Sequence, residues 1–158
     1  MEVNQSVHNA PAGYWGIAFQ SRESTTSLCA YDASFAVGLV HAAAHVVIDG
    51  RVVALIAYDL PYLEPLCHVR PIISSFATAL VLTHEKTERA IACLEIRRGE
   101  GGKCISPVGM DPGLEELAHG VPAARSLPLL LALASGNPMT VDVEELPEHR
   151  LVIQVSPC

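Results

Sequence analysis

Residues 27–50, SLCAYDASFAVGLVHAAAHVVIDG, decide the fold of this chain. From Asp32 onward, apolar side chains recur at three- and four-residue spacing, and the opposite side of the same segment is nearly as apolar. A helix that is hydrophobic all round is a buried one, and its many alanines let neighbouring elements approach closely. Asp49-Gly50 ends the segment, because glycine readily adopts the left-handed conformation that commonly follows a helix. The pattern predicts a buried, Ala-rich helix from Asp32 to Asp49.

Segments of strand character flank this helix. Residues 25–30, TTSLCA, contain two β-branched residues and predict a short strand. Residues 51–60, RVVALIAYDL, form a nearly continuous apolar run of strand length, which is typical of a strand covered on both faces. A helix between two strands makes a βαβ unit, whose strands are parallel and joined by a right-handed crossover. We therefore expect a mixed sheet with helices on its faces.

Further strands are predicted downstream. Residues 74–84 and 90–98 are two apolar segments joined by the polar turn EKTER, which favours a hairpin. Residues 150–156 predict an edge or joining strand. The proline-containing segment 61–71 and the Gly/Pro-rich segment 99–113 predict irregular connections.

Two more helices are expected. The first starts near Asn9, a good N-cap, and runs to about Gln20, because Pro11 is tolerated only in a first turn. The second lies within residues 114–136 and is interrupted or restarted near Pro122.

Composition limits the classes of partner. The chain has 158 residues, enough for one domain with a real core, and it is 50% hydrophobic but only 5% aromatic. Its formal charge is −7 and its longest basic run is Arg97-Arg98, so no basic face exists for nucleic acid. The longest uninterrupted apolar stretches, residues 52–58 and 129–134, are far too short to cross a bilayer. We expect neither a nucleic acid nor a membrane as partner.

The cysteines indicate a compartment. They are odd in number and form no CxxC pair, and the N-terminus lacks the basic and apolar regions of a signal peptide. We expect reduced thiols in a cytoplasmic protein. The five cysteines are Cys29, Cys67, Cys93, Cys104 and Cys158.

Cys29 is the candidate catalytic residue. It precedes the predicted helix, whose N-terminal dipole would stabilise a thiolate and whose free amides could hold an oxyanion. Asp32 opposes thiolate formation by its negative charge, and no general base is recognisable by spacing. Two interpretations stay open, an acyl nucleophile and a small core cysteine.

Other polar residues carry weaker signals. His41 and His45 have the i, i+4 spacing of metal ligands, but Ala42 replaces the glutamate of zinc proteases and no third ligand is identifiable. Asp59 ends a strand, where it is either a loop cap or a site residue. GEGG in residues 99–102 lacks the spacing of a nucleotide-binding loop. We expect no metal and no cofactor.

Four segments in order resemble a known family. SVHNAPAGYWGIA (6–18), STTSLCAYDASFAVGLVHAA (24–43), DGRVVALIAYDLPYLEPL (49–66) and SSFATALVL (74–82) resemble the beta-ketoacyl synthase-like N-terminal domain family. That family has the thiolase-type fold and includes chain-length-factor-like subunits of aryl polyene and other polyketide or fatty-acid-type pathways. The resemblance runs from about Gln5 onward and implies that residues 1–158 form one partial domain. It would be an α/β, thiolase-like half domain, with a mixed sheet and a buried Ala-rich helix, whose first family elements would precede Met1.

The resemblance also has implications for the site. Cys29 falls at the nucleophile position, but Tyr31 and Asp32 follow where the family usually has small residues, including a glycine. The family's second half, which supplies two histidines and much of the oxyanion hole, has no counterpart in this sequence. Because the first helix and the following strand form the dimer interface in thiolase-type folds, the resemblance makes Tyr14, Trp15 and Phe19 candidate interface anchors.

Three hypotheses about function follow. The first is a non-condensing, ketosynthase-like accessory protein of chain-length-factor type. It would be paired with a ketosynthase-type subunit or with a second copy of itself, with an acyl carrier protein as a further partner. The second is an acyltransferase that uses Cys29, with basic groups lent by a partner subunit. The third is a non-catalytic, self-associating domain.

Overall fold

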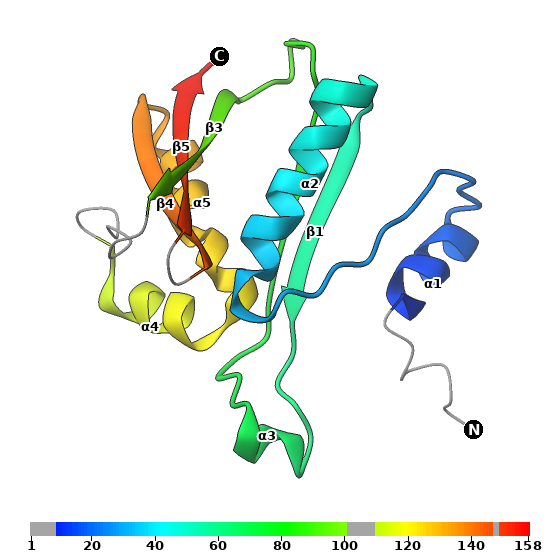
Figure 1. The fold of residues 1–158 in the computed structure, drawn as a ribbon, viewed down its shortest axis with the longest axis vertical. Helices are drawn as coiled ribbons and strands as arrows, with labels where there is room; N and C mark the ends of the chain where they lie inside the picture. Colours follow the sequence, from blue (N-terminus) through cyan, green and yellow to red (C-terminus); the bar gives the residue numbers. More distant parts are fainter. Residues whose placement is uncertain (1–8, 101–109, 147–148) are drawn as a thin grey trace.

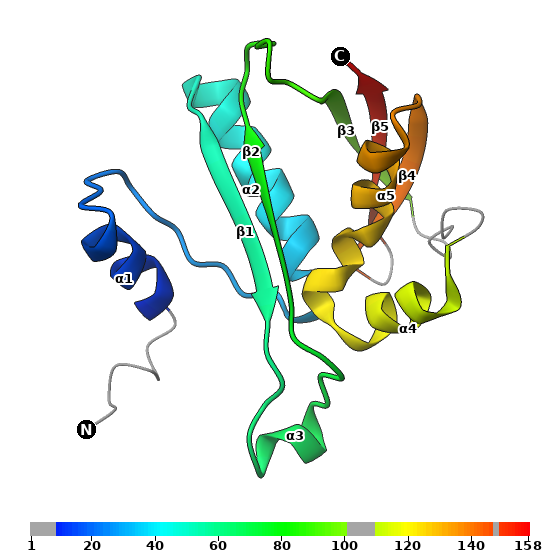
Figure 2. The same cartoon turned by 180° about the vertical axis from the view of Figure 1, so that it is seen from behind.

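The computed structural model describes residues 9–100, 110–146 and 149–158. One long helix lies between a two-stranded and a three-stranded sheet, and both sheets are antiparallel (Figures 1 and 2). The α/β class expected from the sequence is confirmed. The predicted parallel βαβ unit is wrong, because every strand pair in the described residues is antiparallel.

The long helix, α2 (Ser34–Asp49), confirms the prediction of a buried, Ala-rich helix. It is preceded by the 3₁₀ turn η2 (Tyr31–Ala33) and ends at Gly50, whose φ of +63° is the expected left-handed cap. Tyr31–Asp49 is long and apolar enough to cross a membrane by length and composition alone. Phe35 and Leu39 are almost fully buried between the sheets, whereas Val47 and Ile48 of the last turn are exposed.

Sheet A consists of β1 (Val53–Asp59) and β2 (Phe76–Leu82), paired from Val53 with Leu82 to Asp59 with Phe76. The connection between them contains the short helix α3 (Leu66–Val69). β1 was expected to be covered on both faces, but its residues alternate between half-buried and exposed, so only the face toward α2 is covered. The predicted strand at residues 25–30 is also wrong. That segment belongs to no sheet, and a strand without a hydrogen-bonded neighbour is not stable.

Sheet B has the order β3-β5-β4. Its strands are β3 (Ala92–Glu100), β4 (Met139–Leu146) and β5 (His149–Pro157). The predicted hairpin of 74–84 with 90–98 is wrong, because the chain crosses from sheet A to sheet B between these two strands and β3 pairs with β5. β5 is the central strand rather than an edge, and β4 was not anticipated, although Val141 and Val143 alternate with acidic residues there.

The helices after β3 follow the expected interrupted pattern. They are α4 (Pro112–Gly120), the 3₁₀ helix η3 (Pro122–Ser126) and α5 (Leu127–Ser135), with the break at Pro122. Leu129 and Ala132 of α5 join the core formed by α2 and sheet B. Residues 101–109, the middle of the predicted irregular connection, lie outside the described residues together with Cys104.

The first helix, α1 (Ala10–Ala18), confirms its prediction in extent and lies apart from the rest of the protein (Figure 1). None of its residues is buried, and Asn9 occupies the N-cap position without a side-chain hydrogen bond. Trp15 is 51% exposed and Ile17 77% exposed, although both are large and apolar. Residues 19–30 connect this helix to η2.

Candidate functional site

The candidate site is the turn that leads into α2. Tyr31 has a φ of +56°, a left-handed conformation that is uncommon for a residue other than glycine and is a strain often found at functional sites. Ser34 fixes the turn, because its hydroxyl accepts from the Ala30 N–H at 3.0 Å and donates to the Tyr31 carbonyl at 2.7 Å. Strained entries of this kind raise a nucleophile at the start of a helix in hydrolases. Here the raised residue is a tyrosine.

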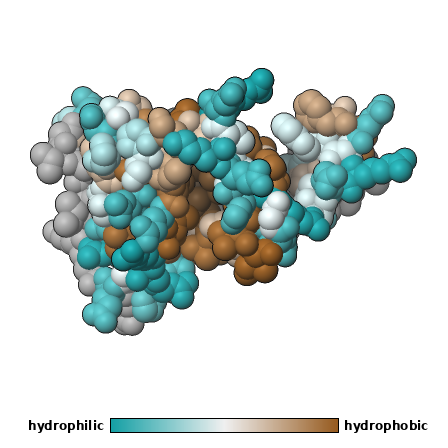
Figure 3. All heavy atoms as spheres, turned by 90° about the horizontal axis from the view of Figure 1, so that it is seen from above, coloured by the Kyte–Doolittle hydropathy of each residue, from teal (hydrophilic) through white to brown (hydrophobic). Residues whose placement is uncertain are grey.

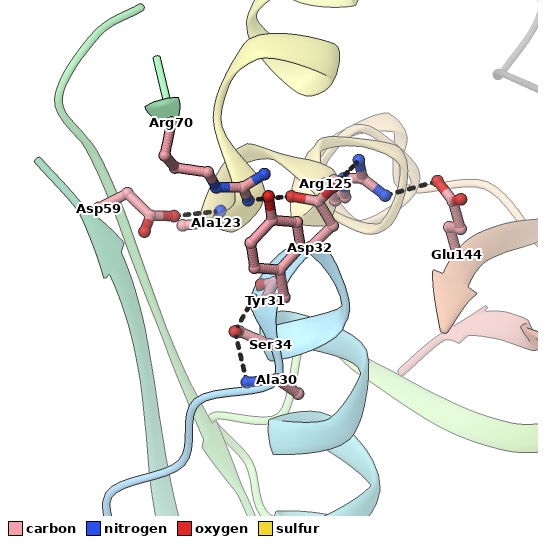
Figure 4. Close-up of polar contacts among 9 residues, drawn as sticks. All are labelled: Ala30, Tyr31, Asp32, Ser34, Asp59, Arg70, Ala123, Arg125 and Glu144. Atoms are coloured by element: carbon pink, nitrogen blue, oxygen red, sulfur yellow. Dashed lines mark hydrogen bonds and ion pairs between the residues drawn. The ribbon is translucent and has the colours of Figure 1, made fainter. Parts of the chain in front are cut away.

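Arginines from two other elements surround this turn (Figure 4). Arg70, from the loop after α3, hydrogen-bonds to Asp32, and its guanidinium carbon lies 3.6 Å from the centroid of the Tyr31 ring. The hydrogen bond that Arg70 donates to Asp32 raises the pKa of Arg70 above its ordinary value, against the opposing effect of burial. A stacked, hydrogen-bonded guanidinium holds the Tyr31 ring in place.

Arg125 extends the same network toward sheet B. Its Nη2 lies 3.2 Å from Oδ2 of Asp32, and its Nη1 donates to Glu144 of β4 at 2.6 Å. The side chain of Arg125 is only 19% exposed. Asp32, expected to oppose a thiolate by its charge, is thus neutralised by two arginines. We call Tyr31, Asp32, Arg70, Arg125 and Glu144 the entry network.

Asp59 lies beside the entry network at the end of β1. Its Oδ2 accepts from the Ala123 N–H at 2.6 Å, so the carboxylate caps the first turn of η3. Burial raises the pKa of Asp59, while the bond from Ala123 and the charge of Arg70 act in the opposite direction. Of its two predicted roles, loop capping is the one supported by this hydrogen bond.

Cys29 lies two residues before the strained turn, in the extended segment, and it is exposed. The thiol is therefore not at the residue with positive φ, and the alternative of a buried core cysteine is wrong for this chain. Its role as an acyl nucleophile stays a prediction.

The two histidines of α2 lie against each other. Their rings make a T-shaped contact with centroids 4.7 Å apart, and Nδ1 of His45 is 2.6 Å from a carboxylate oxygen of Asp49. Nε2 of His41 is buried without a hydrogen-bond partner. Within residues 9–100, 110–146 and 149–158, no three His, Cys, Asp or Glu side chains come together as metal ligands would. The contacts favour a packing role for these two histidines.

Arg70 and Arg125 were missed in the sequence. Arg125 is the lone charge in the apolar segment 121–134, and an isolated arginine there needs a buried partner. That signal was available. Arg70 carries no such signal in the sequence, because it lies in a proline-rich loop whose path cannot be derived from local patterns.

The outer face of sheet A is the second notable surface. All of its side chains are apolar apart from one phenol hydroxyl, with Ile56 47%, Tyr58 50% and Val81 74% exposed. An open depression of about 300 Å³ lies at its end, between Asp59 and Phe76. In the view from above, hydrophobic side chains gather in the middle of the molecule (Figure 3). The outward residues of this face are Ala54, Ile56, Tyr58, Ala77, Ala79 and Val81.

Comparison with known proteins gives one match. The family model described as beta-ketoacyl synthase, N-terminal domain, matches residues 1–103, about two thirds of the chain. No curated protein and no solved structure gives a significant match. The matched range contains α1, α2, sheet A and three members of the entry network, Tyr31, Asp32 and Arg70. Arg125 and Glu144 lie beyond it.

Proposed function

The chain belongs to the beta-ketoacyl synthase N-terminal domain family, and we propose that it is a non-condensing accessory protein of chain-length-factor type. In this role it pairs in the cytoplasm with a ketosynthase-type subunit of a fatty-acid or polyketide-type pathway. The partner performs the covalent chemistry, with acyl groups delivered by an acyl carrier protein. This chain contributes to the wall of the pocket that receives the growing acyl group.

The observation that carries the proposal is that a tyrosine, Tyr31, holds the left-handed position in the turn that leads into α2. A condensing enzyme needs a nucleophile that is activated by a neighbouring base. The residue with positive φ in this turn is Tyr31, whose ring stacks on Arg70. In the part of the chain that the structure describes, no histidine hydrogen-bonds to the entry network. The turn is thus built as a structural junction.

The outer face of sheet A supports the pairing. Contiguous exposed apolar patches on a soluble protein mark interaction sites, and interfaces are rich in aromatic anchors. Tyr58 lies on this face, and Trp15 and Phe19 of the α1 region are exposed and stack with ring centroids 4.4 Å apart. A second thiolase-fold chain would cover both surfaces.

An acyltransferase that uses Cys29 is the second candidate. The observation in its favour is the exposure of the thiol close to the N-terminus of η2 and α2, where an acyl thioester could reach it. Incubation with an acyl thioester, followed by peptide mass spectrometry, separates the two candidates. Preferential acylation of Cys29 over the exposed Cys93, abolished by Cys29→Ser, would overturn the non-condensing assignment.

The direct test is affinity purification of the tagged chain from its native cells, followed by native mass spectrometry. We expect a stoichiometric complex with a protein of full ketosynthase size. Ile56→Arg should abolish the complex by placing a charge on the outer face of sheet A. Thr140→Arg, on the exposed face of β4 in sheet B, is the matched control and should leave the complex intact. Recovery of copies of this chain alone would favour the self-associating domain instead.

A further inference from the structure

Sheet B brings together two cysteines that the proposed function does not use. Sγ of Cys93 lies 3.7 Å from Sγ of Cys158, although 65 positions separate them in the chain. Cys93 is in β3, and Cys158 follows β5 directly. Both residues are exposed to solvent.

The register of the sheet explains the contact. Cys93 is the pairing partner of Ser156, and the Cys158 N–H donates to the Ile91 carbonyl at 3.2 Å, which continues the antiparallel ladder by one step. Cys158 therefore lies opposite Ile91, and Cys93 is its diagonal neighbour on the same face of the sheet. Diagonal neighbours across an antiparallel pair are within reach of each other's side chains.

The contact between the two thiols suits oxidation to a disulfide. Partial desolvation and the neighbouring Cys93 raise the pKa of the Cys158 thiol, against the effect of the Lys86 ammonium, so its thiolate forms less readily than that of an ordinary cysteine. A thiolate formed at either position has its resolving thiol already in contact, which is the arrangement of reversible redox pairs. Closing the bond requires the sulfurs to approach from 3.7 Å to about 2.05 Å, which is within the freedom of two exposed side chains.

We propose that Cys93 and Cys158 are a redox modification site that forms a reversible disulfide when the protein meets hydrogen peroxide. One thiol gives up its proton and its sulfur attacks the peroxide, so that an S–O bond forms, the O–O bond breaks and the leaving hydroxide takes up the proton as the first water. The second thiol also gives up its proton, its sulfur displaces the sulfenic oxygen to form the S–S bond, and the leaving hydroxide takes up that proton as the second water. The two sulfurs lose two electrons in total, and the peroxide gains them. A dithiol reductant reverses the step by thiol–disulfide exchange.

The disulfide would tie β3 to the end of β5 across sheet B. It closes a loop that contains α4, η3, α5 and β4, so it constrains the unfolded chain and stabilises the folded one. The inference does not depend on the accessory role, because Cys93 and Cys158 belong neither to the entry network nor to the outer face of sheet A.

Peptide mapping tests the proposal on the full chain. The reduced protein is treated with hydrogen peroxide, alkylated and digested with trypsin without reduction. We expect residues 90–97 to be recovered linked to residues 151–158, and to be released as separate peptides by dithiothreitol. The oxidised protein should also melt at a temperature several degrees higher than the reduced protein.

Single substitutions make the test specific. Cys158→Ser should abolish the linked peptide and the shift in melting temperature, whereas Cys67→Ser, the matched control on α3, should preserve both. Both variants are first melted under reducing conditions, where each should match the parent protein. Linkage of Cys93 or Cys158 to other cysteines at an equal rate would overturn the proposal, as would linkage only after denaturation in urea.

Discussion

The two sheets cover α2 from opposite sides, yet they differ on their outer faces. Sheet B alternates between an apolar inner face and an outer face that is largely polar, where Arg150 pairs with Asp142 at 3.1 Å. The outer face of sheet A, from Ile56 to Val81, carries no charged residue. An antiparallel sheet that faces water on one side normally alternates as sheet B does. Sheet B therefore has the usual alternation of a sheet that faces water, whereas the outer face of sheet A is apolar although it is exposed.

The two sheets also differ in their strand count. In the described residues both strands of sheet A are edge strands, whereas sheet B has edges at β3 and β4 and a central strand, β5, that is paired on both sides. Free edges are sites of further association. The difference teaches that an apolar run such as residues 51–60 does not by itself establish burial on both faces, because only the face of β1 toward α2 is covered in the described residues.

The same substitution made once in each sheet tests this difference in burial most directly. Ile153 of β5 is fully buried, and Ile56 of β1 is 47% exposed. Ile153→Ala should lower the free energy of unfolding by about 2–5 kcal/mol, because it leaves a cavity in the core. Ile56→Ala should change it by only about 0.5 kcal/mol in the monomer.

Urea unfolding of both variants at a concentration where the chain is monomeric checks the difference. Equal losses would mean that the outer face of sheet A is already covered within the chain, and would contradict the contrast between the two sheets.

A second substitution tests the link between the sheets. Arg125 joins Asp32, at the entry to α2, to Glu144 of sheet B. Arg125→Ala should cost about 1.5–3 kcal/mol of the free energy of unfolding, since hydrogen bonds to charged groups are lost and Asp32 keeps only Arg70. Arg97→Ala is the matched control, because Arg97 pairs with Glu95 on the exposed face of sheet B and such pairs contribute about 0–1 kcal/mol. A cost of Arg125→Ala no larger than that of the control would show the entry network to be dispensable for folding.

The sequence predicted where helices and strands lie better than it predicted which strands pair with each other. α2 and its glycine cap follow from helical periodicity and local backbone preference, so they could be predicted to within two residues. Strand pairing depends on contacts between residues far apart in sequence, and adjacency in the chain suggested the wrong hairpin for β2 and β3. β4 was missed because its alternation lies among acidic residues that favour a loop.

The candidate site was predictable only in part. The position of a turn before α2 followed from the sequence, and the pairing of Tyr31 and Asp32 was recognised there as a departure from the family pattern. The conformation of Tyr31 and the two arginines that hold Asp32 could not be derived, because they come from the loop after α3 and from η3.

A third experiment measures the strain at Tyr31. At a φ of +56°, glycine relieves the steric cost that any side chain pays, which is about 1 kcal/mol. Tyr31→Ala loses the stacking on Arg70 and keeps the strain, whereas Tyr31→Gly loses the stacking and removes it. We expect the free energy of unfolding of Tyr31→Gly to be higher than that of Tyr31→Ala by about 1 kcal/mol, as measured by urea denaturation. The reverse order would mean that the turn does not hold a left-handed residue in solution.

The smallest effect is expected at Asp59, where sheet A ends against η3. Burial raises the pKa of this carboxyl above its ordinary value of 3.8, so the folded protein binds a proton more readily than the unfolded chain does. Stability from this group is therefore fully present below pH 3.8 and is lost as the pH rises through the raised pKa of the folded state.

Asp59→Asn removes this titration. As the pH rises through the same window, the parent should therefore lose stability that the variant does not lose, and the free energy of unfolding of the variant should increase relative to that of the parent. Denaturant unfolding at a series of pH values, taken as the difference between the two proteins, isolates the carboxyl from all other groups. Because Ala123 and Arg70 favour the charged form, a difference that instead widens in favour of the parent would mean that they outweigh burial. In that case the carboxylate would be held in its charged form at the end of sheet A by the Ala123 hydrogen bond and by Arg70.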